Sequence, residues 1–265
     1  MLKCTLPATL TSAYRRISSV LGPLARVFDT VKGKEWYQAD DVAAAYEDKR
    51  FSRGGRLIDT REREAVLSAL APVEGQDILE IACGTGRFTV MLGERGADVI
   101  GMDISKPMML QGVSKANRAG VDGRVGFIRG DAARLPFPDD SFDAVFAMRF
   151  FHLAPSPEGF LSEMRRVSRE TIFFDTFNSF STRTVYNWLL PMGSRLYDDE
   201  TVETMLDEAH LELVHAEHDF VVPYGCYRSI PDRIARPIRS VDERLGETAV
   251  GDRLASVSFW HAKPR

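Results

Sequence analysis

The chain of 265 residues contains only three cysteines, which lie far apart at Cys4, Cys83 and Cys226. An odd number at these spacings provides neither a disulfide framework nor closely spaced zinc ligands, and it indicates a reducing compartment. No run approaches the ~18 consecutive apolar residues of a membrane-spanning helix. We therefore predict a cytoplasmic protein with no metal centre and no transmembrane segment.

The sequence also lacks an excess of positive charge. Lysine and arginine total 34 against 38 aspartates and glutamates, which gives a net charge of −4. This balance disfavours nucleic acid as the main partner. Apolar residues at 44% and charged residues at 27% are ordinary for a globular protein. The length leaves room for one large domain or one domain with an appendage.

Residues 1–34 depart from this balance, since they carry six lysines and arginines and a single acid. Apolar residues recur there at three- and four-residue spacing, which predicts an amphipathic helix. We expect a helical cap over residues 1–60, because such apolar stripes usually face a core. Peripheral contact with an anionic membrane through 1–34 and a transit peptide are the alternatives.

The middle of the chain alternates short apolar runs with longer amphipathic stretches. Buried strands are expected at 78–81, 99–102, 125–128, 144–147 and 171–174, and helices at 86–95, 105–118, 157–168 and 199–210. Strand-like segments at 211–222 and 255–260 follow. The pattern predicts a doubly wound α/β fold, with a mostly parallel seven-stranded sheet, helices on both faces and an antiparallel C-terminal strand pair.

Ligands of such sheets bind beyond the carboxyl ends of the strands. The first expected strand runs into Cys83-Gly84-Thr85-Gly86 and then a helix, so the backbone can turn sharply and present N–H groups to a ligand. An ordinary strand-to-helix turn would look similar. Asp103 ends the next strand, about twenty residues further on, where a carboxylate accepts hydrogen bonds from ribose hydroxyls or caps the following helix.

Two further segments make the pattern specific. Gly130-Asp131-Ala132 follows the third expected strand, and Leu-Pro-Phe-Pro-Asp-Asp-Ser-Phe-Asp ends at Asp143. In this order and spacing the motifs resemble the class I S-adenosylmethionine-dependent methyltransferases, especially the ubiquinone/menaquinone and small-molecule subgroup. The resemblance covers about residues 75–180. It implies S-adenosyl-L-methionine as cofactor and a methyltransferase domain over 61–265, with substrate-side insertions at about 176–198 and 223–252.

The resemblance also implies how the methionine part of the cofactor is held. Glu80 and the backbone of Gly84 and Gly86 would bind it, and Met148, after the fourth expected strand, would lie near the sulfonium. Arg87 stands where a further glycine is common in this family, which is a departure from the family pattern.

For the adenosine part, the resemblance assigns five residues. Asp103 would bind the ribose hydroxyls, while Ile104 and Met108 would lie against the adenine. Asp131 would accept a hydrogen bond from the adenine amino group, and Ala132 would donate its backbone N–H to the ring.

Few catalytic residues are expected, because a sulfonium already activates the methyl group and the protein mainly aligns the acceptor. His152, at the ligand end of a strand, is the candidate base, and its alternative role is packing. The candidate substrate-binding residues are aromatic: Tyr46, Phe51, Phe150 and Phe151. They favour an apolar or aromatic small-molecule or lipid-like acceptor.

Other clusters carry less. His215 and His218 would point to opposite faces of one strand, so with His210 they form no metal site. The arginines between 228 and 239 interleave with acids, which favours a solvated helix face over an anion site. No Asn/Asp-Pro-Pro-aromatic motif follows the fourth expected strand, which disfavours nucleic acid as acceptor. A non-catalytic adenosine-cofactor-binding protein and a methyltransferase acting on RNA or protein are the alternatives.

Overall fold

The computed structural model describes residues 46–48, 50–184 and 194–265. One sheet there has the strand order β3-β2-β1-β4-β5-β7-β6, in which β7 is antiparallel to β5 and β6 and the other neighbours are parallel. The strands are β1 Asp77–Ile81, β2 Asp98–Asp103, β3 Val125–Arg129, β4 Phe142–Ala147, β5 Ser168–Phe177, β6 Leu211–Asp219 and β7 Val257–Pro264. The predicted fold class is confirmed.

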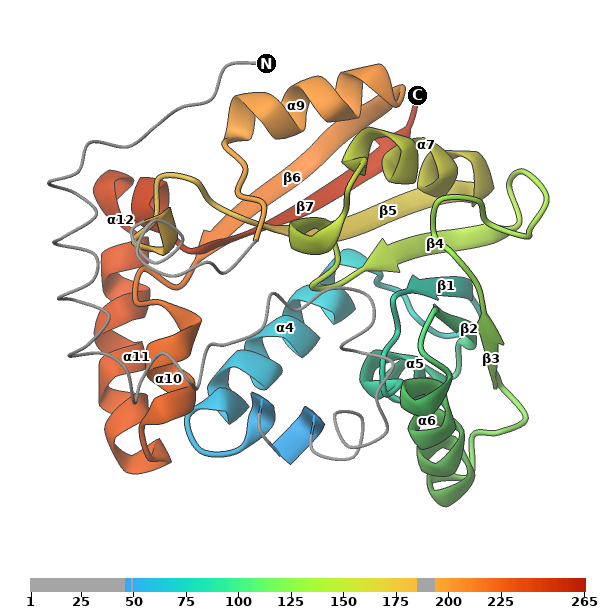
Figure 1. Ribbon diagram of the computed structural model, residues 1–265, viewed down its shortest axis with the longest axis horizontal. Coiled ribbons are helices and arrows are strands. Elements are labelled where there is room, and N and C mark those ends of the chain that lie inside the picture. The colour runs from blue at the N-terminus through green and yellow to red at the C-terminus, as the bar shows by residue number, and fades with distance from the viewer. Residues whose placement is uncertain (1–45, 49, 185–193) are drawn as a thin grey trace, which may run out of the picture.

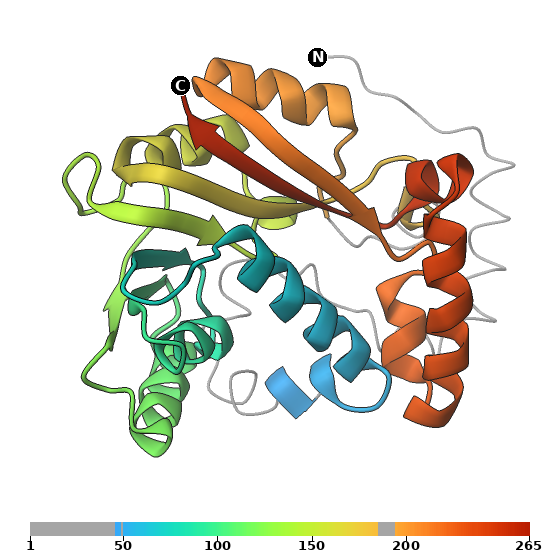
Figure 2. The same cartoon turned by 180° about the vertical axis from the view of Figure 1, so that it is seen from behind.

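Helices cover both faces of the sheet (Figures 1 and 2). One layer comprises α4 Gly55–Ala69, α5 Arg87–Gly93 and α6 Lys106–Ala119, and the other comprises α7 Pro157–Val167 and α9 Asp199–Glu208. Successive strand residues alternate between the two cores. In β4, Phe146 belongs to the core under the first layer, whereas Val145 belongs to the core under the second. Burial on both faces explains why the strands are near-continuous apolar runs.

The chain beyond β6 forms a group of three helices beside α4 (Figure 1). These are α10 Tyr224–Ser229, α11 Asp232–Gly246 and α12 Ala249–Leu254, and they occupy the insertion expected at 223–252. The Gly54 N–H donates to the carbonyl of Ile230 at 3.1 Å. A Cβ at Gly54 would lie 2.3 Å from the carbonyl oxygen of Tyr227, so only glycine permits this close approach.

Several expected boundaries differ from the structure, including those of β6 and β7. β6 ends at Asp219 instead of 222, because Phe220 adopts φ 62° and leaves the extended conformation. β7 begins at Val257 and continues to Pro264, past the expected end at 260. The proposed domain boundary at 60/61 falls inside α4. The segment 1–34 lies outside the described residues.

The prediction of a solvated arginine face is right for Arg233 and Arg236, which are exposed, and wrong for Arg228 and Arg239. Arg228 Nε and Nη2 are shielded from solvent. Arg239 is buried, and its Nη1 and Nη2 lie 2.6 and 2.7 Å from the carboxylate of Asp219 at the end of β6. Acids close in sequence suggested solvent, whereas the partner that buries Arg239 lies twenty residues away.

The other surface expectations concern histidines and membrane spans. His210 and His215 are exposed, and His218 Nδ1 lies 2.8 Å from Ser258 Oγ. Across the described ranges, no group of three or more potential ligands could hold a metal ion. No helix in those ranges is long and apolar enough to cross a bilayer.

Candidate active site

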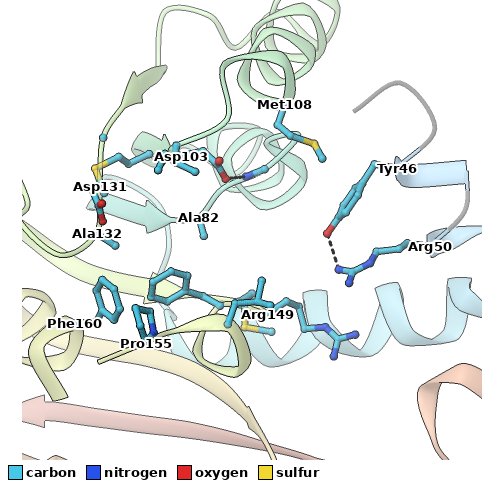
Figure 3. A pocket seen from close by; sticks show the side chains of 17 residues that line it. Tyr46, Arg50, Ala82, Asp103, Met108, Asp131, Ala132, Arg149, Pro155 and Phe160 are labelled. Atoms are coloured by element: carbon cyan, nitrogen blue, oxygen red, sulfur yellow. Dashed lines mark hydrogen bonds between the residues drawn. The ribbon is translucent and has the colours of Figure 1, made fainter. Parts of the chain in front are cut away.

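A pocket opens beyond the carboxyl ends of β1, β2, β3 and β4 (Figure 3). It brings together nine of the residues predicted from the sequence: Tyr46, Gly84, Asp103, Ile104, Met108, Asp131, Ala132, Met148 and Phe150. The other five predicted residues do not line it: Phe51, Glu80, Gly86, Phe151 and His152. Residues from four separate strand ends therefore converge where the doubly wound fold places its ligands.

The two glycines after β1 have different structural reasons. Gly84 adopts φ 54° and lines the pocket, and a Cβ there would meet nothing within 4 Å. Gly86 adopts φ 68° at the start of α5, where a Cβ would lie 2.7 Å from the ring of Phe127. Gly86 is thus required by packing against β3. Gly84 leaves open space in which a ligand can approach the backbone.

Asp103 is held by backbone donors on both sides. Its Oδ2 accepts from the Gly84 N–H at 2.8 Å, and its Oδ1 accepts from the Ser105 N–H at 2.7 Å. Burial raises the pKa of Asp103, and these N–H bonds oppose that rise. The side chain that caps α6 is Ser105, which accepts from the Met108 N–H. Because a carboxylate has about four acceptor sites, Asp103 retains capacity toward the pocket.

Glu80 lies beneath the glycine loop and is 2% exposed. Its Oε2 accepts from Thr89 Oγ1 of α5, and burial raises the pKa of Glu80 to about 7. The carboxyl group therefore fixes the start of α5 under Gly84 and Gly86 from inside the core.

Asp131 and Ala132 lie at the end of the pocket opposite Tyr46 (Figure 3). Asp131 and Ala132 follow β3 there, and the Asp131 Oδ1 accepts from the Ala133 N–H at 3.0 Å. Ala132 is 9% exposed and lines the pocket. The open backbone at Gly84, the carboxylates of Asp103 and Asp131 and the apolar Met108 are residue types that fit S-adenosylmethionine.

The two phenylalanines after β4 point to different places. Phe150 lines the pocket and contacts Phe160 edge to face, with 4.9 Å between the ring centroids. Phe151 is fully buried and lies 4.6 Å from the ring of Phe174 in β5. Leu153, Pro155 and Phe160 also line the pocket, so its wall on this side is apolar.

Tyr46 and Phe51 are the two predicted aromatic residues before α4. Of these two, only Tyr46 lines the pocket. The ring of Phe51 lies under the guanidinium of Arg87, 4.4 Å from its centroid. Just after Tyr46, Glu47 accepts from Thr85 Oγ1 at 2.6 Å and is bound by Lys115 of α6. These contacts place residues 46–48 over the glycine loop.

His152 is 8% exposed, and its ring lies 4.7 Å from that of Phe177. Burial, followed by repulsion from Arg149 and other arginines, holds its pKa well below the usual range. The imidazole is therefore neutral at pH 7, directly behind the residues that line the pocket.

Two arginines in the pocket lining were not predicted as site residues. Arg149 follows β4 with φ 61°, and its N–H donates to Asp175 Oδ1 at 2.5 Å. Arg50 Nη1 donates to Tyr46 Oη at 2.6 Å. Arg149 lies two residues after β4, at the ligand end of the sheet. A cation at such a position is a sequence signal that could have identified it. No local pattern marks Arg50.

Comparison with known proteins shows what this chain resembles. Residues 79–171 match the family described as a methyltransferase domain. Demethylmenaquinone methyltransferase of Beutenbergia cavernae is 40% identical over 135 residues, covering 49% of this chain and 51% of that protein. A sterol 24-C-methyltransferase of Gibberella zeae is 32% identical over 146 residues, covering 52% of this chain and 34% of that protein. The chain thus spans about half, or less, of these relatives.

Solved structures agree on the fold. Magnesium protoporphyrin IX methyltransferase of Synechocystis PCC 6803, with bound SAH, has a TM-score of 0.59 at 16% identity, covering 79% of this chain and 85% of that one. The [4+2]-cyclase SpnF has a TM-score of 0.59 at 20% identity, covering 77% and 80%. Residues 79–171 therefore resemble a methyltransferase domain, and they lie within a sheet of Rossmann-like order.

Proposed function

We propose that this protein transfers the methyl group of S-adenosylmethionine to an apolar or aromatic small-molecule or lipid-like acceptor. One observation carries the proposal: a single pocket joins the Asp103 and Asp131 carboxylates to an apolar wall that includes Phe150. Relatives named for menaquinone and sterol substrates support an acceptor of this kind.

The proposed cofactor contacts follow the strand ends. Gly84 would bind the methionine part through its backbone, with Glu80 and Gly86 acting beneath it as supports of the loop. Met148 would lie beside the sulfonium.

The adenosine contacts come from the loops after β2 and β3. Asp103 would accept from the ribose hydroxyls, and Ile104 and Met108 would contact the adenine face. Asp131 and Ala132 would bind the adenine edge. All five residues line the pocket, so no rearrangement of the sheet is needed.

When bound, the sulfonium supplies an activated methyl group. The chain's own residues would then hold the acceptor in line with it and exclude water. Phe150 and Tyr46 would contact the acceptor directly. Phe151 would support Phe150 from the core. Phe51, whose ring packs against Arg87, would support the segment that carries Tyr46.

We also propose His152 as the residue that accepts a proton from the acceptor. Its support is position: it lies between Phe150 and Leu153, both of which line the pocket. His152→Gln should lower kcat about 100-fold, as loss of a general base does. An unchanged kcat and pH–rate profile with a lowered Tm would assign His152 to packing against Phe177.

Calorimetry with Asp103→Ala tests the cofactor site. Loss of a charge-assisted hydrogen bond costs about 1.5–3 kcal/mol, so affinity for S-adenosylmethionine should fall about 10- to 100-fold. Asp98→Ala at the other end of β2 is the matched control, because Asp98 is exposed and its ion pair with Arg124 is long, at 3.7 Å. Equal binding by both variants would contradict the site.

Incubation with cell extract tests the reaction, since the acceptor should gain the mass of one methylene. Binding of S-adenosylmethionine without any mass gain would identify a non-catalytic cofactor-binding protein instead. A gain confined to RNA or protein would replace the small-molecule acceptor.

The segments outside the sheet belong to the same proposal. We propose a cytoplasmic protein in which residues 1–60 form a cap and residues 61–265 the methyltransferase domain, with acceptor-shaping insertions at 176–198 and 223–252. Deleting residues 1–34 should lower acceptor turnover but not cofactor affinity. If the six cations there contact an anionic membrane, the deletion should also abolish sedimentation with anionic liposomes.

A further inference from the structure

Four arginines from separate parts of the chain meet at one end of the pocket. This arginine cluster comprises Arg50 before α4, Arg149 after β4, Arg183 after β5 and Arg228 in α10. Two aromatic rings lie between three of these arginines, Arg149, Arg183 and Arg228. The Tyr224 ring lies 4.2 Å from the Arg149 guanidinium and 5.8 Å from that of Arg228. The Phe177 ring lies 5.1 Å from Arg149 and 3.4 Å from Arg183.

The carboxylates near the arginine cluster are already engaged. Glu62 is bound by Arg149 Nε at 3.0 Å and also by Arg87. Asp175 Oδ1 accepts from the Arg149 backbone, and its Oδ2 lies 4.0 Å from Arg149 Nη1. Within the described residues, neither Arg183 nor Arg228 forms an ion pair with a carboxylate. The cluster therefore holds more positive than negative charge.

Several donors of the cluster are shielded from solvent and lack a hydrogen-bond partner in the described ranges. They are Arg149 Nη1, Arg183 Nε, Arg228 Nε and Arg228 Nη2. Buried donors of charged groups without an acceptor cost free energy. Burial and repulsion from neighbouring arginines lower the pKa values of Arg183 and Arg228 to about 9, which is the effect expected when a counter-anion is missing.

The arginine cluster is continuous with the pocket. Arg50 and Arg149 line it, and Figure 3 shows both guanidinium groups at the end opposite Asp131 and Ala132. Phe150 and Phe160 line the apolar wall of the same pocket. A molecule bound against this wall would present one end to the cofactor site and the other to the arginines.

Building on the function proposed above, we propose that the acceptor carries an oxyanion, a carboxylate or a phosphate, bound by Arg149, Arg183 and Arg228. Planar guanidinium groups bind such oxyanions through paired hydrogen bonds and tolerate partial burial better than lysine. The acceptor is then an amphipathic acid whose apolar body contacts Phe150. Its acid group fixes its orientation toward the methyl donor.

Calorimetry with three ring compounds tests the proposal. Benzoate, phenyl phosphate and the neutral benzamide are titrated into full-length protein saturated with S-adenosylhomocysteine. At least one anion should bind ten times or more tightly than benzamide, and the tighter anion identifies the oxyanion. Equal binding of benzamide and both anions, or no anion binding at millimolar concentration, would overturn the proposal.

Arg228→Met and Arg183→Met test the residues. Each should lower anion affinity at least tenfold and leave S-adenosylhomocysteine affinity unchanged. Arg228→Met should also raise the Tm of the unliganded protein, because it removes an unpaired, largely buried charge. Arg233→Met, on the exposed face of α11, is the matched control and should change neither property.

The outcomes separate the two proposals. Unchanged anion affinity in Arg228→Met and Arg183→Met, with a lowered Tm, would make these arginines structural and reject the oxyanion site. Failure of the unaltered protein to bind S-adenosylhomocysteine would instead contradict the methyltransferase function itself.

Discussion

At the residue scale, Glu80 shows how the site depends on a buried acid. Its pKa is raised to about 7 by burial, so between pH 4.5 and 7 the folded state binds more protons than the unfolded state. Stability conferred by the protonated form is therefore lost as pH rises through this window. Glu80→Gln keeps an acceptor for Thr89 and removes the titration.

We expect the stability of the unaltered protein relative to Glu80→Gln to fall by about 2–3 kcal/mol from pH 5 to pH 8. Urea unfolding at both pH values measures the difference. Asp175, whose pKa is raised to about 6, is present in both proteins and cancels in the comparison. A difference that does not change with pH would show that Glu80 ionises as freely in the folded state as in the unfolded state.

At the scale of elements, one buried carboxylate joins α4 to the glycine loop and to β4. Glu62 of α4 is 1% exposed and binds Arg87 at the start of α5 and Arg149 after β4. Burial acts to raise the pKa of Glu62, but the two arginines bring it below its usual value. Arg87, which stands in place of a glycine of the resembled family, thus forms this buried ion pair.

We expect Glu62→Gln to destabilise the protein by about 3–5 kcal/mol, because it leaves buried guanidinium groups without their carboxylate. Urea unfolding with the matched Glu212→Gln variant checks this. Glu212 pairs with Lys263 at 3.3 Å across β6 and β7, and both side chains are about half exposed. That exposed pair should be worth less than about 1 kcal/mol. Equal losses in the two variants would count against the burial argument.

At the scale of the whole molecule, the pocket lies at the carboxyl ends of β1 to β4, whereas β6 is the edge strand farthest from them in the sheet. S-adenosylhomocysteine at 100 times its Kd should stabilise the fold by about 2.7 kcal/mol. Hydrogen exchange should slow around 82–86, 103–105 and 130–132. The amides of β6 and α9, on the upper edge of Figure 1, should slow only as far as global unfolding slows. Local protection in β6 instead would place the ligand elsewhere.

The sequence by itself predicted the sheet and the residues of the proposed cofactor half of the site. Strand-forming runs are local patterns, and in parallel sheets the residue after each strand is brought to the same edge whatever the rest of the chain does. Gly84 and Asp103 were therefore predictable from their places after the strands, and the resemblance added Asp131 and Met148. The structure places all four in one pocket.

The residues of the proposed acceptor half are brought together only by the tertiary structure. Phe150 and Phe151 are adjacent residues of the same type. Packing against Phe174 of β5 decides that Phe151 is the one in the core. Arg183 and Arg228 are 45 residues apart, and only the fold brings both near Arg149. Neither forms an ion pair with a carboxylate of the described residues. Local sequence fixes strands and turns, whereas charge balance in a buried space depends on every segment that reaches it.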